Sequence, residues 1–274
     1  MFVPQILVKS EEIFEPESHI SQYDRAREIS KYLLMHYGVV DDAFERADHP
    51  LAAAHGYPRR LSEVLRASAQ STGTRVRTAL DVGCNVGGVS HALSTWVEDR
   101  VVGVDISRRS IEVAKALTIG GGGVFSIVQQ GPFTKDVEVR LPDADTCARV
   151  EFEVGDGADL QAIDGTFDAV LLSNVVDRVA DPALCLQQFG ASERTLRSGG
   201  LLMIACPWSW YPEYSPPGSW LGSAWDATPS EEAVKTLLAN DFDLVTEVDE
   251  PCVLRQNPRE YDYFEAHVTV WQKH

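Results

Sequence analysis

The sequence lacks the features that mark membrane and secreted proteins. It has no uninterrupted apolar run of about eighteen residues or more, the length that a membrane helix needs. The opening residues, Met-Phe-Val-Pro-Gln-Ile-Leu-Val-Lys-Ser, contain neither a long apolar segment nor a basic start. A secretory signal requires both. We therefore expect a cytoplasmic protein with no membrane partner.

Basic residues are also scarce, and no lysine- or arginine-rich run occurs. The formal net charge is -17, with 24 basic against 41 acidic residues. A protein that binds RNA or DNA needs basic surface to neutralise phosphates. The composition therefore argues against a nucleic-acid partner and favours a small-molecule substrate.

The five cysteines form no Cys-x-x-Cys pair. They are Cys84, Cys147, Cys185, Cys206 and Cys252, and they are scattered along the chain. This spacing argues against a zinc site and against a disulfide framework. We expect reduced thiols and no metal.

A glycine-punctuated turn follows a short apolar stretch at residues 78–82. The pattern is Asp81-x-Gly83-x-Asn85-x-Gly87, and no lysine follows the glycines, which excludes a phosphate loop for ATP or GTP. A dinucleotide-binding loop needs glycine where Asn85 stands. The spacing instead resembles the acidic-x-Gly-x-Gly-x-Gly loop of class I S-adenosylmethionine (SAM) methyltransferases, with an ordinary strand-to-helix turn as the alternative.

Acidic residues end the next two predicted strands. Asp105 follows the apolar stretch from Arg100, and its carboxylate suits the two hydroxyls of a ribose. Asp156 ends the strand that begins near Arg149, at a position that resembles the adenine site of methyltransferases; a plain strand-end turn is the alternative. The residues expected to bind SAM are Asp81, Gly83, Asn85, Gly87, Asp105, Ile106, Asp156, Gly157, Ala158 and Asn174.

The order of the strands predicts the fold class. Near-continuous apolar runs at 78–82, 100–105, 149–154, 165–174 and 197–206 are typical of parallel strands covered on both faces. Residues 242–248 and 266–271 alternate apolar and polar residues, as antiparallel strands do. We expect an α/β protein with the class I SAM-dependent methyltransferase fold, a Rossmann-like seven-stranded sheet whose last strand is antiparallel.

We expect an arm at residues 1–20 and one methyltransferase domain at 21–274. Within it, cap helices span 21–70, the core begins at 76, an aromatic insertion spans 207–225, and a hairpin insertion spans 251–265. Residues 119–142 are a further insertion, whose glycines suggest a mobile turn.

The additions to the core supply the candidate substrate residues. A helix over 21–38 places Tyr23 and Asp24 at its start, although it could merely complete the core. The aromatic insertion suits a flat ring, with a packed apolar cover as the alternative, and Arg255 offers a bidentate fork for a carboxylate. The residues expected to bind substrate are Tyr23, Asp24, Tyr37, Trp208, Tyr211, Glu213, Trp220 and Arg255.

Four motifs carry a closer resemblance. They are Tyr-Leu-Leu-x-His-Tyr-Gly near the start, Leu-Asp-x-Gly-Cys-x-Val-Gly, Pro-x-x-Trp-x-x-Glu-Tyr-Ser-Pro with the following Trp-Leu-Gly, and the final His-x-Thr-Val-Trp. Together they resemble the 4-mercaptohistidine N1-methyltransferase family, the methyltransferase part of ovothiol-biosynthesis proteins. The resemblance covers roughly residues 21–273.

This resemblance implies methyl transfer from SAM to a ring nitrogen of 5-thiohistidine (4-mercaptohistidine), or of 5-selenohistidine in ovoselenol formation. Positioning is the main catalytic task, because an imidazole lone pair is available near neutral pH; Tyr23, Asn174 and Tyr211 are the candidates. The alternatives are an O-, C- or S-directed small-molecule methyltransferase and a non-catalytic SAM-binding partner.

Overall fold

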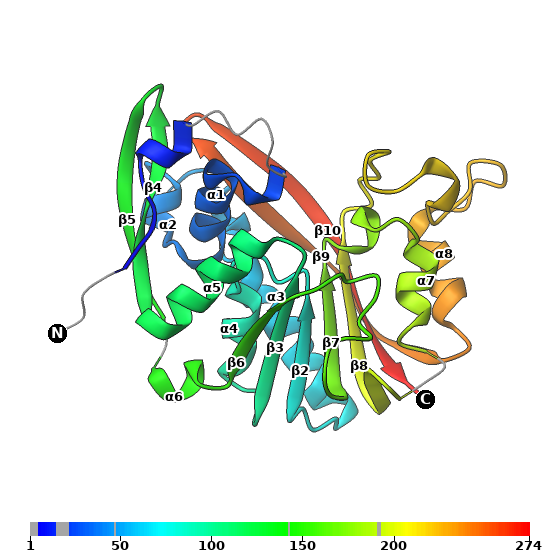
Figure 1. Ribbon diagram of the computed structural model, residues 1–274. Helices are drawn as coiled ribbons and strands as arrows, with labels where there is room; N and C mark the ends of the chain where they lie inside the picture. The colour runs from blue at the N-terminus through cyan, green and yellow to red at the C-terminus, as the bar shows by residue number, and fades with distance from the viewer. Residues whose placement is uncertain (1–4, 15–21, 47, 142, 191–192) are drawn as a thin grey trace.

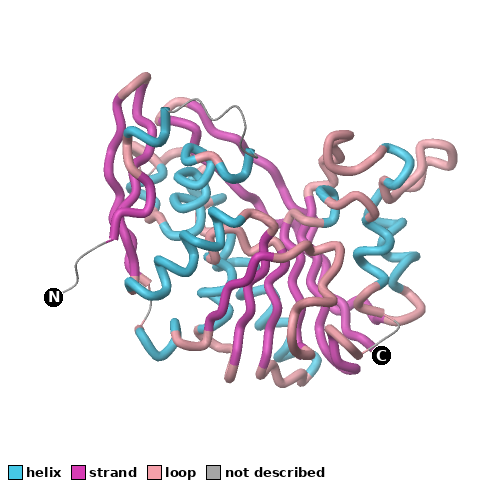
Figure 2. The backbone as a smooth tube through the Cα atoms, in the orientation of Figure 1, coloured by secondary structure: helices cyan, strands magenta, loops and turns pink. Residues whose placement is uncertain are grey.

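The computed structural model describes residues 5–14, 22–46, 48–141, 143–190 and 193–274. Figures 1 and 2 show a twisted central sheet with helices packed against it and a smaller sheet beside it. The central sheet has the strand order β6-β3-β2-β7-β8-β10-β9. Its strands are β2 (Thr78–Val82), β3 (Arg100–Asp105), β6 (Val150–Val154), β7 (Phe167–Ser173), β8 (Leu196–Cys206), β9 (Phe242–Asn257) and β10 (Glu260–Lys273).

Strand direction confirms the predicted fold class. β2 pairs in parallel with β3 and β7, and β6 and β8 extend the parallel set on either side. β10 runs antiparallel to both β8 and β9. β9 therefore runs in the same direction as the parallel strands, and of the described strands in this sheet β10 alone runs in the opposite direction. This is the sheet of the class I methyltransferases.

Alternation along the strands explains why both faces are covered. Ala79 packs in a core with helices α3, α4 and α5, whereas the next residue, Leu80, packs in a core with α7 and α8. Successive side chains of a strand point to opposite faces, so a continuous apolar strand needs cover on each. The covering helices are α3 (Tyr57–Thr72), α4 (Gly88–Ser94), α5 (Arg108–Gly120), α7 (Pro182–Gln187) and α8 (Ser230–Leu238).

The remaining helices are short, apart from α1. They are η1 (Glu11–Phe14), η2 (Gln22–Asp24), α1 (Ala26–Tyr37), α2 (Val40–Ala43), η3 (Ala52–Ala54), α6 (Ala144–Cys147), η4 (Val176–Arg178) and η5 (Pro217–Ser219). Of the described residues, no helix is both long and apolar enough to cross a bilayer.

The segment 119–142 forms most of a second sheet, which corrects the expectation of a glycine turn. β4 (Gly122–Gln130) and β5 (Phe133–Arg140) make an antiparallel hairpin, and β1 (Gln5–Val8) pairs in parallel with β4. Phe125 and Val137 belong to the core that this sheet shares with α1. The alternating apolar residues of the hairpin cover α1, which is why it forms strands.

The final hairpin is longer than the sequence indicates. β9 and β10 remain paired through the segment 251–265, with Pro251 opposite Glu265 and Arg255 opposite Tyr261. That segment is the distal half of the hairpin, not an insertion between two short strands. The Arg255 guanidinium donates to the Val128 carbonyl at 2.8 Å, so the hairpin reaches from the central sheet to the second sheet (Figure 1).

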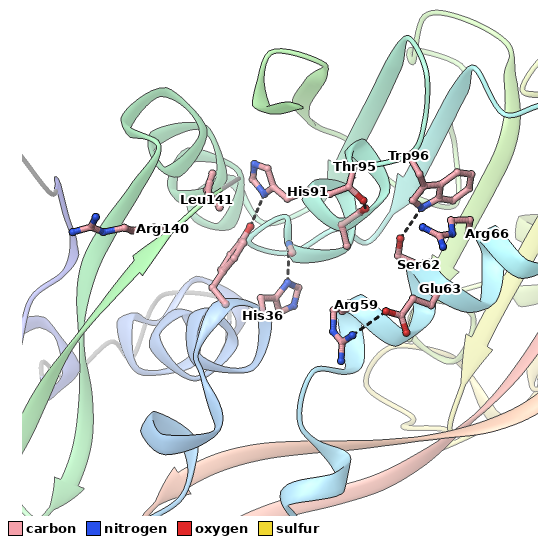
Figure 3. Close-up of a pocket in the computed structure, with 13 residues that line it drawn as sticks. His36, Arg59, Ser62, Glu63, Arg66, His91, Thr95, Trp96, Arg140 and Leu141 are labelled. Atoms are coloured by element: carbon pink, nitrogen blue, oxygen red, sulfur yellow. Dashed lines mark hydrogen bonds and ion pairs between the residues drawn. The ribbon is translucent and has the colours of Figure 1, made fainter. Parts of the chain in front are cut away.

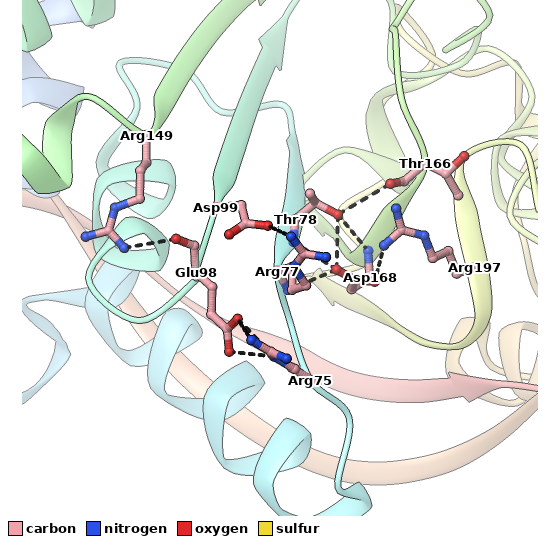
Figure 4. A network of polar contacts seen from close by, with 9 residues as sticks. All are labelled: Arg75, Arg77, Thr78, Glu98, Asp99, Arg149, Thr166, Asp168 and Arg197. Carbon is pink, nitrogen blue, oxygen red and sulfur yellow. Dashed lines mark hydrogen bonds and ion pairs between the residues drawn. The ribbon is translucent and has the colours of Figure 1, made fainter.

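Asp168 holds together the amino ends of three strands. Its Oδ2 accepts the backbone N–H groups of Arg77 and Thr78, each at 2.9 Å, and its Oδ1 pairs with Arg197 (Figure 4). Because β2, β3, β6, β7 and β8 are parallel, their carboxyl ends meet at the opposite edge of the sheet. Open α/β sheets bind ligands at that edge.

Candidate active site

A cavity of about 970 Å³ lies at the carboxyl edge of the central sheet. Its wall combines the ends of β2, β3, β6 and β7 with α1, α3, the loop after β8 and the distal part of β10. We name two parts of this wall. The glycine-loop part comprises Asp81, Gly83, Cys84, Asn85, Asp105, Ile106, Asp156 and Gly157; the tyrosine part comprises Tyr23, Arg178, Ser209, Tyr211 and Tyr214.

The backbone after β2 takes a form that only glycine permits at Gly83. Its φ is 75°, and a Cβ there would lie 2.3 Å from the Val175 side chain. The Gly83 N–H donates to the Val104 carbonyl at 2.7 Å, which presses the loop against β3. Gly87, with φ of 88°, faces Phe152 and does not line the cavity. Gly87 therefore shapes the loop from behind.

Asp105 ties the glycine loop to the end of β3. Its Oδ2 accepts the Asn85 N–H at 2.9 Å, and its Oδ1 accepts the Ser107 N–H at 2.8 Å. Burial raises the pKa of Asp105, and these two hydrogen bonds oppose the rise. Each carboxylate oxygen keeps a second lone pair for a ligand hydroxyl.

Asp81 presents a buried acceptor to the cavity. Its side chain is fully buried, and its Oδ2 accepts the Ser90 hydroxyl at 2.6 Å. Its Oδ1 has no hydrogen-bond partner within the part of the chain that the structure describes. Burial raises the pKa of Asp81 to about 7, against the hydrogen bond from Ser90. A buried acceptor without a partner is costly, and it fits a ligand that brings a donor.

The ends of β6 and β7 complete the glycine-loop part. Asp156 accepts the Ala158 N–H at 2.8 Å, and Ala158 itself does not line the cavity. A Cβ on Gly157 would lie 2.8 Å from Val82, so the chain packs closely there. Asn174 has φ of 57° and accepts the Tyr57 hydroxyl at 3.5 Å, which places its amide in the wall where β7 ends.

His36 is a wall residue that sequence reasoning missed. Its Nδ1 accepts the Gly88 N–H at 2.9 Å, at the first residue of α4 (Figure 3). Burial, and then the neighbouring His91, lower the pKa of His36 to about 3. The ring is therefore neutral, with its proton on Nε2. His36 also borders a second cavity of about 300 Å³. The motif Tyr-Leu-Leu-x-His-Tyr-Gly contained the signal.

Aromatic rings and one guanidinium form the tyrosine part. The ring centroids of Tyr23 and Tyr214 are 6.0 Å apart, and those of Tyr211 and Tyr214 are 6.4 Å apart. The Arg178 Cζ lies 4.5 Å from the Tyr211 ring centre. The sequence placed Tyr23 and Tyr211 near substrate but gave no role to Arg178 or Tyr214.

Two expected substrate residues from the N-terminal region serve the packing of the protein. The Tyr37 hydroxyl donates to the Val86 carbonyl at 2.7 Å and borders the second cavity, because helix α1 turns it away from the first. Asp24 accepts the Ser107 hydroxyl at 2.6 Å and the Arg109 N–H at 3.3 Å. Its carboxylate is thus engaged at the start of α5, and neither side chain lines the site.

Part of the aromatic insertion is packed cover, although Trp225 is 99% exposed. Trp208 packs against the core beside α7 and α8, and Trp220 stacks on Trp210 and donates to the Ser215 carbonyl at 2.8 Å. Glu213 is exposed. These three residues do not line the cavity. The proline-rich loop folds back on itself, so Tyr211 and Tyr214 face the site in their place.

Arg255 is also elsewhere, which corrects its expected role. It is 6% exposed, and its guanidinium donates to the Val128 carbonyl and to the Gln129 side chain. These contacts join the long hairpin to the second sheet. Among the described arginines, Arg178 is the one that lines the cavity.

Residues 80–204 match the family described as a methyltransferase domain. The matched segment contains the glycine-loop part and Arg178. It excludes Tyr23, Tyr211, Tyr214 and β10, which form much of the remaining wall. The match therefore bears on the cofactor and leaves the substrate open.

Two curated relatives match over a similar share of the chain. An uncharacterized 37.1 kDa protein in transposon TN4556 of Streptomyces fradiae is 31% identical over 132 residues, which are 47% of this chain and 30% of the relative. Ajmaline N-methyltransferase of Rauvolfia serpentina is 25% identical over 128 residues, 47% of this chain and 35% of the relative. The chain spans about a third of the length of these relatives.

Among solved structures, the N-methyltransferase NodS from Bradyrhizobium japonicum WM9 is similar, with a TM-score of 0.49 and 14% identity. The likeness covers 83% of this chain and 99% of NodS. A second NodS structure, in complex with S-adenosyl-L-homocysteine, has a TM-score of 0.48, 14% identity, and coverage of 87% and 98%.

SAM is the cofactor that the match to a methyltransferase domain indicates. The residues present fit it. The unpartnered Oδ1 of Asp81 suits a cationic amine, the lone pairs of Asp105 suit ribose hydroxyls, and Gly83 and Gly157 leave backbone where a side chain would intrude.

Proposed function

We propose that this chain is a SAM-dependent N-methyltransferase whose acceptor is a histidine derivative, 5-thiohistidine or 5-selenohistidine, methylated on a ring nitrogen. One observation carries the proposal: a single cavity joins the glycine-loop part to the tyrosine part. Donor and acceptor could therefore meet without leaving the protein. Apart from Arg178, the tyrosine part is built from segments outside the matched domain, where three of the four motifs shared with the mercaptohistidine methyltransferase family also lie.

The lining of the tyrosine part suits a flat, polar ring. Tyr23, Tyr211 and Tyr214 offer ring faces and hydroxyls within one cluster. The net charge of -17 disfavours a nucleic-acid acceptor. The partial match to ajmaline N-methyltransferase supports nitrogen as the attacked atom.

Bound SAM would supply a methyl group activated by its sulfonium. The nitrogen lone pair forms the new N–C bond in line as the S–C bond breaks, and the sulfur leaves with that electron pair as S-adenosylhomocysteine. The chain contributes positioning, which can supply ~7–11 kcal/mol of the barrier lowering. We assign that task to Tyr23, Asn174 and Tyr211, which lie in one wall. A neutral imidazole nitrogen, with a reference pKa of ~6.5, attacks without a general base, and its remaining proton passes to solvent.

The pocket must also turn the chalcogen aside, because a thiolate or selenolate is intrinsically the better nucleophile. Purified protein should be incubated with SAM and 5-thiohistidine, 5-selenohistidine or histidine. With 5-thiohistidine or 5-selenohistidine, we expect S-adenosylhomocysteine and a product methylated on a ring nitrogen. NMR identifies the methylated atom. Methylation on sulfur or selenium contradicts the proposal.

Two other outcomes identify the alternatives. Turnover of an unrelated acceptor indicates a different small-molecule methyltransferase, directed at oxygen, carbon or sulfur. Calorimetric binding of SAM without product from any imidazole indicates a non-catalytic SAM-binding partner.

A further inference from the structure

Arg178 is held rigidly at the end of η4, beside the cavity. Its Nη1 donates to the Ser209 carbonyl at 2.8 Å and pairs with the Asp177 Oδ2 at 2.8 Å. Its Nη2 donates to the Ser209 hydroxyl at 2.9 Å. Asp177 is fully buried and also accepts the Ser209 N–H at 3.0 Å. The loop after β8 and the end of η4 therefore fix the direction of the guanidinium.

These contacts engage the side of the guanidinium formed by Nη1 and Nη2, and they leave the side formed by Nε and Nη2 open to a ligand. A guanidinium has five N–H bonds, and the side formed by Nε and Nη2 presents two of them in parallel. Within the described part of the chain, Nε has no hydrogen-bond partner, and Nη2 has only the Ser209 hydroxyl. Tyr211 covers one face of the group at 4.5 Å. The open edge has the geometry that binds a carboxylate with two hydrogen bonds.

The charges of the cavity wall make this edge distinctive. Of the described residues that line the cavity, Arg178 is the only lysine or arginine, while the carboxylates are Asp81, Asp105, Asp156, Asp262 and Glu265. His36 is neutral, since burial lowers its pKa to about 3. An anionic group entering the cavity thus has one charged partner in the wall.

We propose that Arg178 binds the α-carboxylate of the acceptor, so that the enzyme selects a zwitterionic amino acid over the amine of the same ring. This inference rests on the proposed function. It also moves the carboxylate site from Arg255, which is engaged elsewhere, to Arg178. Asp262 and Glu265 of β10 lie in the same wall and leave acidic groups for the ammonium of that amino acid.

The test compares the amino acid with its decarboxylated counterpart, thiolated histamine, on wild type, Arg178→Gln and Arg178→Lys. We expect wild type to prefer the amino acid in kcat/KM by about 10- to 100-fold, the range for losing charged hydrogen bonds. Arg178→Gln should abolish that preference, mainly through KM, with little change for the amine. Arg178→Lys should keep part of the preference, because the charge remains without the fork.

The matched control is Arg75→Gln, which removes an arginine from an exposed pair with Glu98 at the opposite edge of the sheet (Figure 4). It should keep the wild-type preference. The affinity for SAM, measured by calorimetry, should be the same in all four proteins and also reports that each is folded.

Three results overturn the inference. Equal use of amino acid and amine by wild type removes the carboxylate site and leaves the proposed function intact. A loss of SAM affinity in Arg178→Gln that matches the loss for the amino acid assigns Arg178 to the cofactor's own carboxylate. Failure of wild type to methylate either ring contradicts the proposed function itself. If Arg178→Gln does not fold, the inference is still tested by the preference of wild type for the amino acid and by the reduced preference expected of Arg178→Lys.

Discussion

The Nδ1 atom of His36 accepts the backbone N–H of Gly88, so a side chain of α1 caps the helix that follows the glycine loop. The first N–H groups of a helix have no partner within the helix. Gly87, the residue before α4, has no side chain to offer one. Helix α1 therefore supports the glycine loop as well as the wall of the cavity.

His36→Ala should weaken both the fold and the binding of SAM. Loss of a helix cap costs ~0.5–2 kcal/mol, and the freed first turn of α4 no longer steadies the loop. Urea unfolding and calorimetry measure the two effects. His274→Ala, at an exposed histidine, is the control and should change neither. An unchanged SAM affinity in His36→Ala would show that the cap is independent of the loop.

The same histidine gives the free protein an acid sensitivity. The folded pKa of about 3 lies below the unfolded reference of ~6.5, so the unfolded chain binds more protons between these values. The free energy of unfolding should therefore be fully retained above pH ~6.5 and fall as the pH drops toward 3. His91, whose pKa burial lowers to about 4, adds to the slope. Urea denaturation at several pH values measures this dependence. Between pH ~3 and ~6.5, the free energy of unfolding of His36→Ala should change less with pH than that of wild type.

Asp81 should give the stability of the free protein the opposite dependence on pH, and it should also make SAM binding depend on pH. Its folded pKa of about 7 is above the unfolded reference of ~3.9, so the free protein loses stability as the pH rises from about 4 through 7. Ionised Asp81 is the form that attracts a cationic amine, and SAM affinity should increase across pH 6–8. Asp81→Asn should weaken SAM binding and flatten this profile. An Asn variant with the wild-type profile would remove Asp81 from contact with the cofactor.

The two strand-end acids should both matter for SAM. Asp105→Ala and Asp156→Ala each remove a carboxylate from the wall, and loss of a charged hydrogen bond costs ~1.5–3 kcal/mol. Asp105→Ala should be the more damaging, because it also frees the N–H groups of Asn85 and Ser107. Calorimetric titration with SAM provides the measurement. Wild-type affinity in both variants would contradict the location of the cofactor.

Gly83→Ala should damage the loop in two separable ways. The left-handed backbone costs a residue with Cβ ~1–2 kcal/mol, and the new methyl group meets the Val175 side chain. Adding Val175→Ala should relieve the clash and leave the backbone cost. Thermal unfolding of the single and double variants distinguishes these terms; a double variant no better than the single one would show that backbone strain dominates.

Arg255→Gln should lower stability without changing the KM of the acceptor. The substitution leaves the buried Val128 carbonyl without its charged donor, at a cost of ~1–3 kcal/mol. Urea unfolding should detect the loss, while steady-state kinetics should match wild type. An increase in KM alone, with stability intact, would return Arg255 to the substrate site.

The central sheet, and the meeting of the strand-end acids in one cavity, were predictable because strand order and strand ends determine which side chains meet. Asp81, Asp105 and Asp156 follow successive parallel strands, so one edge must collect them. The acceptor side depends on how separate segments pack on that edge. The sequence favoured Trp220 and Arg255 by residue type, and their neighbours in space engage both in structural contacts.

Signals for the missed residues were local and weak. Arg178 lies four residues beyond Asn174, close enough to the end of β7 to reach the same edge. His36 belonged to a motif used only for resemblance. Neither position could be assigned a role without knowing that α1 covers the start of α4 and that the loop after β8 turns back over η4.

The long hairpin also bears on the order in which the protein can fold. Lys31 of α1 donates to Gln256 of β9, a contact across 225 positions of the chain. Contacts of such separation close late, because the loop entropy must be overcome first. The glycine-loop part also depends on a later strand, because the Asn174 N–H donates to the Ala205 carbonyl of β8 at 2.8 Å. The part of the cavity wall that β10 contributes is completed only when this late hairpin pairs with β8.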